Sequence, residues 1–256
     1  MKTPLARARR PVAFLGEVLL SAAAAAAAGG QRRYRPQDLV RVLADTSARA
    51  VPIVCVVNFL VGAILAFVGA VQLAKFGAGI FVADLVGIAL AREMAAIITA
   101  VVISGRTGAA FAAELATMQT NEEVDALAVL GLPAMDFLVL PRVAALLAMM
   151  PLLFVFACLA GLLGGMVVSA AMLDISPAAY LARTADALNW THLGLGAAKS
   201  LVFGALIGMV GCYWGLYAQR NAAGVGRATT GAVVTSIVGI IVIDAVFALC
   251  ANTLGI

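Results

Sequence analysis

Charged residues are scarce in this sequence. Only 12% of its 256 residues are Asp, Glu, Lys or Arg and 64% are apolar, whereas a soluble domain has about 25% charged and about 45 to 50% apolar residues. This composition excludes a water-soluble single globule. The charges are also uneven, because residues 1–50 hold nine of the seventeen basic side chains against three acids. We interpret this basic arm as facing an anionic bilayer surface. We expect no nucleic-acid partner, because a protein that binds nucleic acid needs a polar folded surface.

Histidine and cysteine are also rare. The single histidine, His192, allows neither a Ser–His dyad nor an HExxH metal site. The segment GAAKS at 196–200 is no phosphate loop, because Ala198 stands where such a loop needs Gly. Four cysteines lie far apart in apolar runs without a CxxC pair, which favours buried thiols over disulfides or a metal site. We therefore expect no enzyme, no metal and no cofactor, so that energy for any work must come from a partner or an ion gradient.

Five apolar stretches are long enough to cross about 30 Å of hydrocarbon, which takes about 20 helical residues. The sequence therefore predicts an all-α polytopic membrane protein. The third stretch contains Pro141 and Pro151 and exceeds one simple span, which predicts a tilted or bent helix. The predicted spans are residues 51–73, 76–103, 137–173, 193–218 and 228–254.

The distribution of Lys and Arg outside these stretches predicts the orientation. Thirteen would lie on the side of the N-terminus, and only Lys75 and Arg183 on the opposite side. Because cytoplasmic loops are enriched in Lys and Arg, we expect a multi-pass protein of the inner (cytoplasmic) membrane. Its N-terminus would be cytoplasmic and its C-terminus periplasmic.

Residues 1–50 are expected to form a separate basic arm in front of a membrane domain at 51–256. Residues 11–30 combine a basic start, an apolar middle and small residues, as a secretory signal does. Glu17 interrupts the apolar stretch, however, and QRRYR follows it. These features favour an amphipathic helix that lies in the cytoplasmic interface of the membrane.

Residues 104–136 are expected to form a soluble connection on the cytoplasmic side, with five acids against one base. Thr120 followed three residues later by Glu123 fits a capping box, and Gly131 supplies a helix stop. The pattern predicts a short helix over residues 121–130.

This short helix would expose its acidic residues. Its apolar residues Val124, Leu127 and Leu130 could then face another surface. A solvated charged turn is the alternative.

Charges inside spans cost about 2.5 to 3.5 kcal/mol each at a helix centre and tend to mark a pathway or a buried pair. Arg92 and Glu93 are adjacent, so on an α-helix they lie about 100° apart and are expected to have different partners. Our hypothesis is that they line or brace a central cavity and that Asp244 contributes from the fifth span; structural bracing alone is the alternative.

Pairs of glycines four residues apart would let helices approach closely, within one subunit or at a dimer seam. These pairs are Gly161 with Gly165, Gly204 with Gly208, and Gly211 with Gly215.

One long series of motifs resembles a known family. The resemblance is carried by the motifs RE, GRTG, AEL, EEVDAL and LPR between residues 92 and 142, and by GVGRATTGAVVTS at 224–236. Through these motifs the chain resembles the MlaE/YrbE-type permeases, membrane subunits of ABC transporters that move phospholipids. The resemblance implies an N-terminal interfacial helix, five membrane helices and a cytoplasmic coupling helix at 121–130. Two departures are Met94–Ala96, where many members have Gly-Pro, and Ala116, where Gly is usual; a proline kink after the Arg-Glu pair is therefore not expected.

The resemblance also implies partners. A separate ABC ATPase would receive the coupling helix, an MCE-domain protein would bind on the periplasmic side, and a STAS-domain protein often binds the ATPase. A homodimer would enclose a cavity for phospholipid. The residues implied in ATPase coupling are Glu114, Glu122, Glu123, Asp125 and Leu127, and those implied in the lipid cavity are Phe67, Leu73, Phe76, Arg92 and Glu93.

Two other functions are compatible with the residues alone. An ion-coupled carrier or channel could use Arg92, Glu93 and Asp244 as a relay, and would transport without any ATPase. A non-transporting membrane scaffold could use the acidic helix to recruit a soluble partner.

Overall fold

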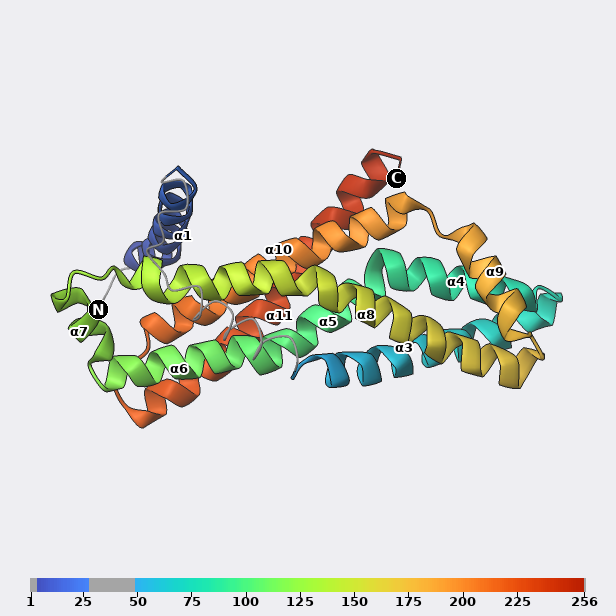
Figure 1. The fold of residues 1–256 in the computed structure, drawn as a ribbon, viewed down its shortest axis with the longest axis horizontal. Helices are drawn as coiled ribbons and strands as arrows, with labels where there is room; N and C mark the ends of the chain where they lie inside the picture. The colour runs from blue at the N-terminus through green and yellow to red at the C-terminus, as the bar shows by residue number, and fades with distance from the viewer. Residues whose placement is uncertain (1–3, 28–48, 256) are drawn as a thin grey trace. The chain divides into compact units, whose positions relative to one another are not determined.

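A computed structural model describes residues 4–27 and 49–255 (Figure 1). Every regular element in this part of the chain is helical, which confirms the predicted all-α class. Residues 28–48 of the predicted basic arm, including the end of its predicted interfacial helix, lie outside the described residues. The α-helices are α1 (Pro4–Ala27), α3 (Val51–Leu73), α4 (Val82–Ala89), α5 (Ala95–Ile103), α6 (Ala109–Thr120), α7 (Glu123–Val129), α8 (Leu140–Leu173), α9 (Pro177–Ala187), α10 (Trp190–Leu216) and α11 (Ala222–Thr253).

Short 3-10 and π turns connect or interrupt these helices. In the π turns an N–H bonds to the carbonyl five residues earlier, as Ala95 does to Leu90, and such turns are frequent at functional sites. The 3-10 turns are η1 (Ala74–Phe76) and η2 (Gly79–Phe81), and the π turns are η3 (Leu90–Met94), η4 (Ser104–Gly108) and η5 (Met135–Val139).

Five helical stretches among the described residues are long and apolar enough to cross a membrane, which is the predicted number. They are Val51–Phe76, Gly79–Thr120, Met135–Leu173, Trp190–Leu216 and Ala222–Thr253. The third contains Pro151 within α8, as expected, whereas Pro141 is the second residue of that helix.

The helix of the second span does not stop at residue 103, where the span is predicted to end. It continues through η4 and α6 to Thr120, so that the connection begins at residue 121 and not at 104. Both glycines of SGRTG lie within the π turn η4, so they do not end the helix. The Ala-rich segment that follows has a strong intrinsic preference for helix.

The predicted capping box is wrong. Thr120 ends α6, and its hydroxyl donates to the carbonyl of Ala116 at 2.9 Å. Asn121 instead donates its side-chain amide to Glu123 Oε1 at 3.0 Å. The predicted helix at 121–130 is therefore shorter, and α7 begins at Glu123 after Glu122, whose φ of 60° is left-handed.

The end of α7 follows the prediction. Gly131 has a φ of 74°, and its N–H bonds to the carbonyl of Ala128 at 3.1 Å. The N–H of Leu132 bonds to the carbonyl of Leu127 at 3.0 Å. This pair of bonds is a Schellman motif, in which glycine carries the left-handed residue without strain.

Contacts divide the chain into two compact units. Among the described residues, the first unit holds 4–27, 103–147 and 204–239, and the second holds 49–102, 148–203 and 240–255. In the first unit, α1 packs into the core through Phe14 and Val18, which share a cluster with Leu138, Val143 and Leu216.

The second unit depends on close helix contacts made by glycine. A Cβ on Gly62 would lie 1.9 Å from the carbonyl oxygen of Gly161, and one on Gly164 would lie 2.0 Å from that of Phe59. The backbones of α3 and α8 therefore touch without side chains between them. Of the three predicted glycine pairs, this contact involves Gly161 and places it within one subunit.

Helix α9 is an element that the sequence analysis did not predict. Pro177 opens it, and the Ser176 hydroxyl accepts from the N–H of Ala179 at 3.3 Å. The helix packs against α4, where Arg183 pairs with Asp84 at 2.9 Å.

Candidate functional site

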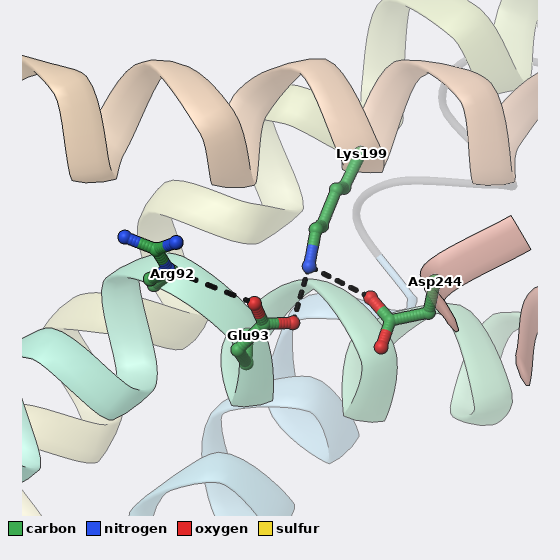
Figure 2. Close-up of polar contacts among 4 residues, drawn as sticks. All are labelled: Arg92, Glu93, Lys199 and Asp244. Atoms are coloured by element: carbon green, nitrogen blue, oxygen red, sulfur yellow. Dashed lines mark hydrogen bonds and ion pairs between the residues drawn. The ribbon is translucent and has the colours of Figure 1, made fainter. Parts of the chain in front are cut away.

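Four charged side chains meet in the second unit (Figure 2). The ammonium of Lys199 donates to Asp244 Oδ1 at 2.8 Å and to Glu93 Oε2 in a close contact. The guanidinium of Arg92 lies 3.9 Å, measured from Nε, from the other oxygen of Glu93. Two positive and two negative side chains therefore form a cluster with no net charge.

Local structure explains how these side chains reach one another. Arg92 and Glu93 lie in the π turn η3, Lys199 on α10 and Asp244 on α11. A Cβ on Gly196 would lie 2.2 Å from the carbonyl oxygen of Ala91. Glycine at this position lets α10 approach η3 closely, one turn before Lys199.

Burial differs within the cluster. The side chain of Lys199 is 0% exposed, whereas those of Arg92 and Glu93 are 25% exposed and that of Asp244 is 19% exposed. A buried ammonium is tolerated only where it is paired and hydrogen-bonded, and two carboxylates fulfil that need here. The partly exposed members, and not Lys199, are the ones that a ligand could touch.

The sequence analysis found three members of this cluster and missed one. Arg92, Glu93 and Asp244 are brought together by Lys199. Lys199 lies within the predicted fourth span, but it was not assigned to this cluster. Arg92 and Glu93 were expected to have different partners, but they also approach each other. The signal that would have identified Lys199 was its place inside an apolar span, where a cation needs a buried anion.

The predicted apolar cavity residues have different surroundings. Phe67 is 53% exposed and Phe76 is 82% exposed. Leu73, in contrast, packs against a buried cluster that includes Ala70 and Val82. Their assignment to a cavity wall stays a prediction.

The short helix α7 lies in the first unit and buries one side. Val124 is buried and Leu127 packs against the same core cluster, as predicted. Glu122 and Glu123 are exposed. Leu130 is 73% exposed, because α7 ends at Val129 and the chain turns there.

Two of the acids predicted to contact an ATPase have partners within the chain. Glu114 pairs with Arg142 at 3.0 Å. Arg142 is buried, and it also donates to the carbonyl of Leu138 at 2.7 Å and lies 5.7 Å from the ring centre of Phe111. These contacts attach α6 to the segment that returns from α7.

The second of these acids is Asp125. Its carboxylate forms two contacts with the guanidinium of Arg220, at 2.7 and 3.0 Å. Sequence analysis missed both arginine partners, since they lie far from the acids along the chain. Among the described residues, no group of three or more His, Cys, Asp or Glu side chains is placed to hold a metal ion.

The chain is similar in sequence to a known family of proteins. The model of the permease MlaE family matches residues 39–250. A probable ABC transporter permease protein of Rickettsia conorii is 36% identical over 204 residues, covering 80% of this chain and 79% of that protein. One of Synechocystis sp. is 41% identical over 167 residues, covering 65% and 64%. The protein TRIGALACTOSYLDIACYLGLYCEROL 1, chloroplastic, of Arabidopsis thaliana is 37% identical over 173 residues, covering 68% and 49%.

Proposed function

Since this chain belongs to the MlaE permease family of ABC transporters, we propose that it moves phospholipids or related lipids between membranes. A separate ATPase subunit would supply the energy. The name of the Arabidopsis relative refers to a galactosylated diacylglycerol, which supports a lipid as the substrate class.

The observation that carries this proposal is the neutral cluster around Lys199 (Figure 2). It places polar groups inside helices that are otherwise apolar. An amphiphile needs both an apolar surface for its chains and a few placed polar groups for its headgroup. Arg92 is the member suited to a phosphate, because guanidinium binds phosphate oxygens in a paired geometry.

The same cluster argues against an ion-coupled relay. A cation carrier would use the carboxylates of Glu93 and Asp244 as its site. Both already accept from the buried ammonium of Lys199, so an entering cation would first have to displace it. The cost of leaving a charge buried without a partner makes that displacement unfavourable.

On the cytoplasmic side, α7 is proposed to dock on the ATPase. The helix presents the acids Glu122 and Glu123 together with Val129 and Leu130, which are 88% and 73% exposed. Exposed apolar side chains beside charges are typical of a contact surface. A non-transporting scaffold would use the same surface, but it would not move lipid.

The remaining partners follow from the resemblance to the family. We propose a homodimer, an MCE-domain protein on the periplasmic side and a STAS-domain protein on the ATPase. The charge distribution supports an inner-membrane location with a cytoplasmic N-terminus. Exposed apolar residues of α3 and α11, such as Phe67 and Val242, would face lipid or the second copy.

Reconstitution tests the proposed function against its rivals. The chain would be purified from its native membrane with co-eluting proteins and placed in vesicles that contain a fluorescent phospholipid. Lipid movement that requires ATP and the co-purified ATPase is expected. Transport by the chain alone under a proton or sodium gradient would favour the ion carrier, and a verified ATPase complex that moves no lipid would favour the scaffold.

A further inference from the structure

The connection between α10 and α11 is joined to α7 by one ion pair. Arg220 lies in this connection and faces Asp125 of α7 in a paired geometry, with Nη1 2.7 Å from Oδ2 and Nη2 3.0 Å from Oδ1. Both side chains are about half exposed, 48% and 53%. Paired contacts between guanidinium and carboxylate fix direction as well as distance.

The connection around Arg220 is itself held in place. Arg227 of α11 donates to the side-chain oxygen of Gln219 in a close contact. The side-chain oxygen of Asn221 accepts from the N–H of Gly224 at 2.7 Å. Arg220 is therefore presented from an ordered turn at the start of α11.

Helix α7 is short, and its packing on the core is apolar. It has seven residues, and isolated helices shorter than about 12 residues are marginal in water. Val124 and Leu127 attach one side of it to the core, and apolar contacts of this kind are not directional. The pair with Arg220 is the contact best suited to fix its rotation.

The energy of the pair suits an orienting role better than a folding role. Exposed ion pairs contribute only about 0.2 to 1 kcal/mol, so the protein should fold without it. A loss of that size still shifts the population of one orientation by about 1.4-fold to fivefold.

We propose that Arg220 is a positioning residue that acts through Asp125 to set the orientation in which α7 meets the ATPase. This inference rests on the proposed function. It removes Asp125 from the set of direct ATPase contacts and leaves Glu122, Glu123, Val129 and Leu130 for that role. The α10–α11 connection thereby becomes a second element through which ATP hydrolysis is coupled to α11.

A charge exchange in the reconstituted complex tests this inference. Asp125→Arg and Arg220→Asp would be compared with the double exchange and with Asp186→Arg, a charge reversal on the exposed surface of α9. Each single variant is expected to lower the lipid moved per ATP hydrolysed by about 1.4-fold to fivefold. The double exchange should recover most of the loss. Arg220→Lys, which keeps the charge, should lose less coupling than Arg220→Asp but should not reach the wild-type value, because an ammonium cannot form the paired contact.

Further outcomes separate the possible failures. Melting temperatures of the permease alone should differ only slightly among the variants, since the pair is exposed. Two outcomes would overturn the positioning role alone. In one, the double exchange moves as little lipid per ATP as the worse single variant. In the other, the single variants move as much lipid per ATP as Asp186→Arg. A wild-type chain that binds no ATPase and moves no lipid would overturn the proposed function and this inference together.

Discussion

The ammonium of Lys199 lies 2.8 Å from the carboxylate of Asp244, although 45 positions separate the two residues in the chain. Both belong to helices that are long and apolar enough to cross a membrane. With Glu93 as second acceptor, the lysine holds three helical segments of the second unit together. Each member of this cluster is therefore costly to remove alone.

Lys199→Met tests the balance of charge in this cluster. The substitution leaves Asp244 without its cation and leaves Glu93 with Arg92 alone, at 3.9 Å. Removing one partner of a buried pair costs about 3 to 5 kcal/mol, and we expect the lower part of that range because both carboxylates are partly exposed. The melting temperature in detergent should fall clearly, whereas Lys75→Met on the exposed turn η1 should leave it unchanged.

A triple variant separates bracing from transport. Lys199→Met with Glu93→Gln and Asp244→Asn removes three of the four charges and leaves Arg92, whose side chain is 25% exposed. This variant should recover most of the lost stability. If the cluster meets the lipid headgroup, this variant folds but moves little lipid per ATP. Full transport by the triple variant would show that the cluster is only a brace.

Much of the fold follows from the sequence, because hydrophobic length alone identifies a membrane helix. The first span was predicted with the bounds 51–73 that α3 has. The second span was cut short at residue 103, since glycines and Arg106 resemble a helix end and nothing in a hydropathy pattern signals a π turn. Contacts over long separations, such as those of Lys199 and Arg220, depend on how helices pack and are not contained in local patterns.

Glu114→Gln tests the buried guanidinium of Arg142. Arg142 is 7% exposed while the side chain of Glu114 is 58% exposed, so the substitution removes the countercharge of a buried cation. A buried charged group that loses its partner costs about 1 to 3 kcal/mol or more. Glu122→Gln makes the same change in charge at an exposed site and should cost almost nothing. Equal melting temperatures of the two variants would contradict the pairing.

Gly62→Ala tests the contact between α3 and α8. The added Cβ would lie 1.9 Å from the carbonyl oxygen of Gly161, which is backbone and cannot rotate away. We expect strong destabilisation or loss of folded protein, since overpacking costs about 1 to 3 kcal/mol and occasionally more. Gly194→Ala is the matched control on α10, because apart from its chain neighbours and the backbone of its own helix no atom of the described residues lies within 4 Å of its Cβ position. Alanine there should be neutral or stabilising by about 0.5 to 1 kcal/mol, measured by melting temperature and yield.

Tyr180→Phe tests a buried hydroxyl on α9. The side chain is 0% exposed, and its hydroxyl has no hydrogen-bond partner among the described residues. Removing an unpaired buried polar group should leave stability unchanged or raise it by about 1 kcal/mol. Ser176→Ala on the same helix should instead destabilise by about 1 kcal/mol, because it removes the N-cap that bonds to Ala179. A lower melting temperature for Tyr180→Phe would show that the hydroxyl has a bound partner.

The same variant should change the response to high pH. Burial raises the pKa of Tyr180 to about 12, whereas an exposed tyrosine has a pKa of about 10. The native state therefore holds this proton more tightly than the unfolded state, so its contribution is complete below about pH 10 and is lost as the pH rises towards about 12. Melting temperatures measured across this range should fall less steeply for Tyr180→Phe than for the wild type. Parallel curves would contradict the burial of this phenol.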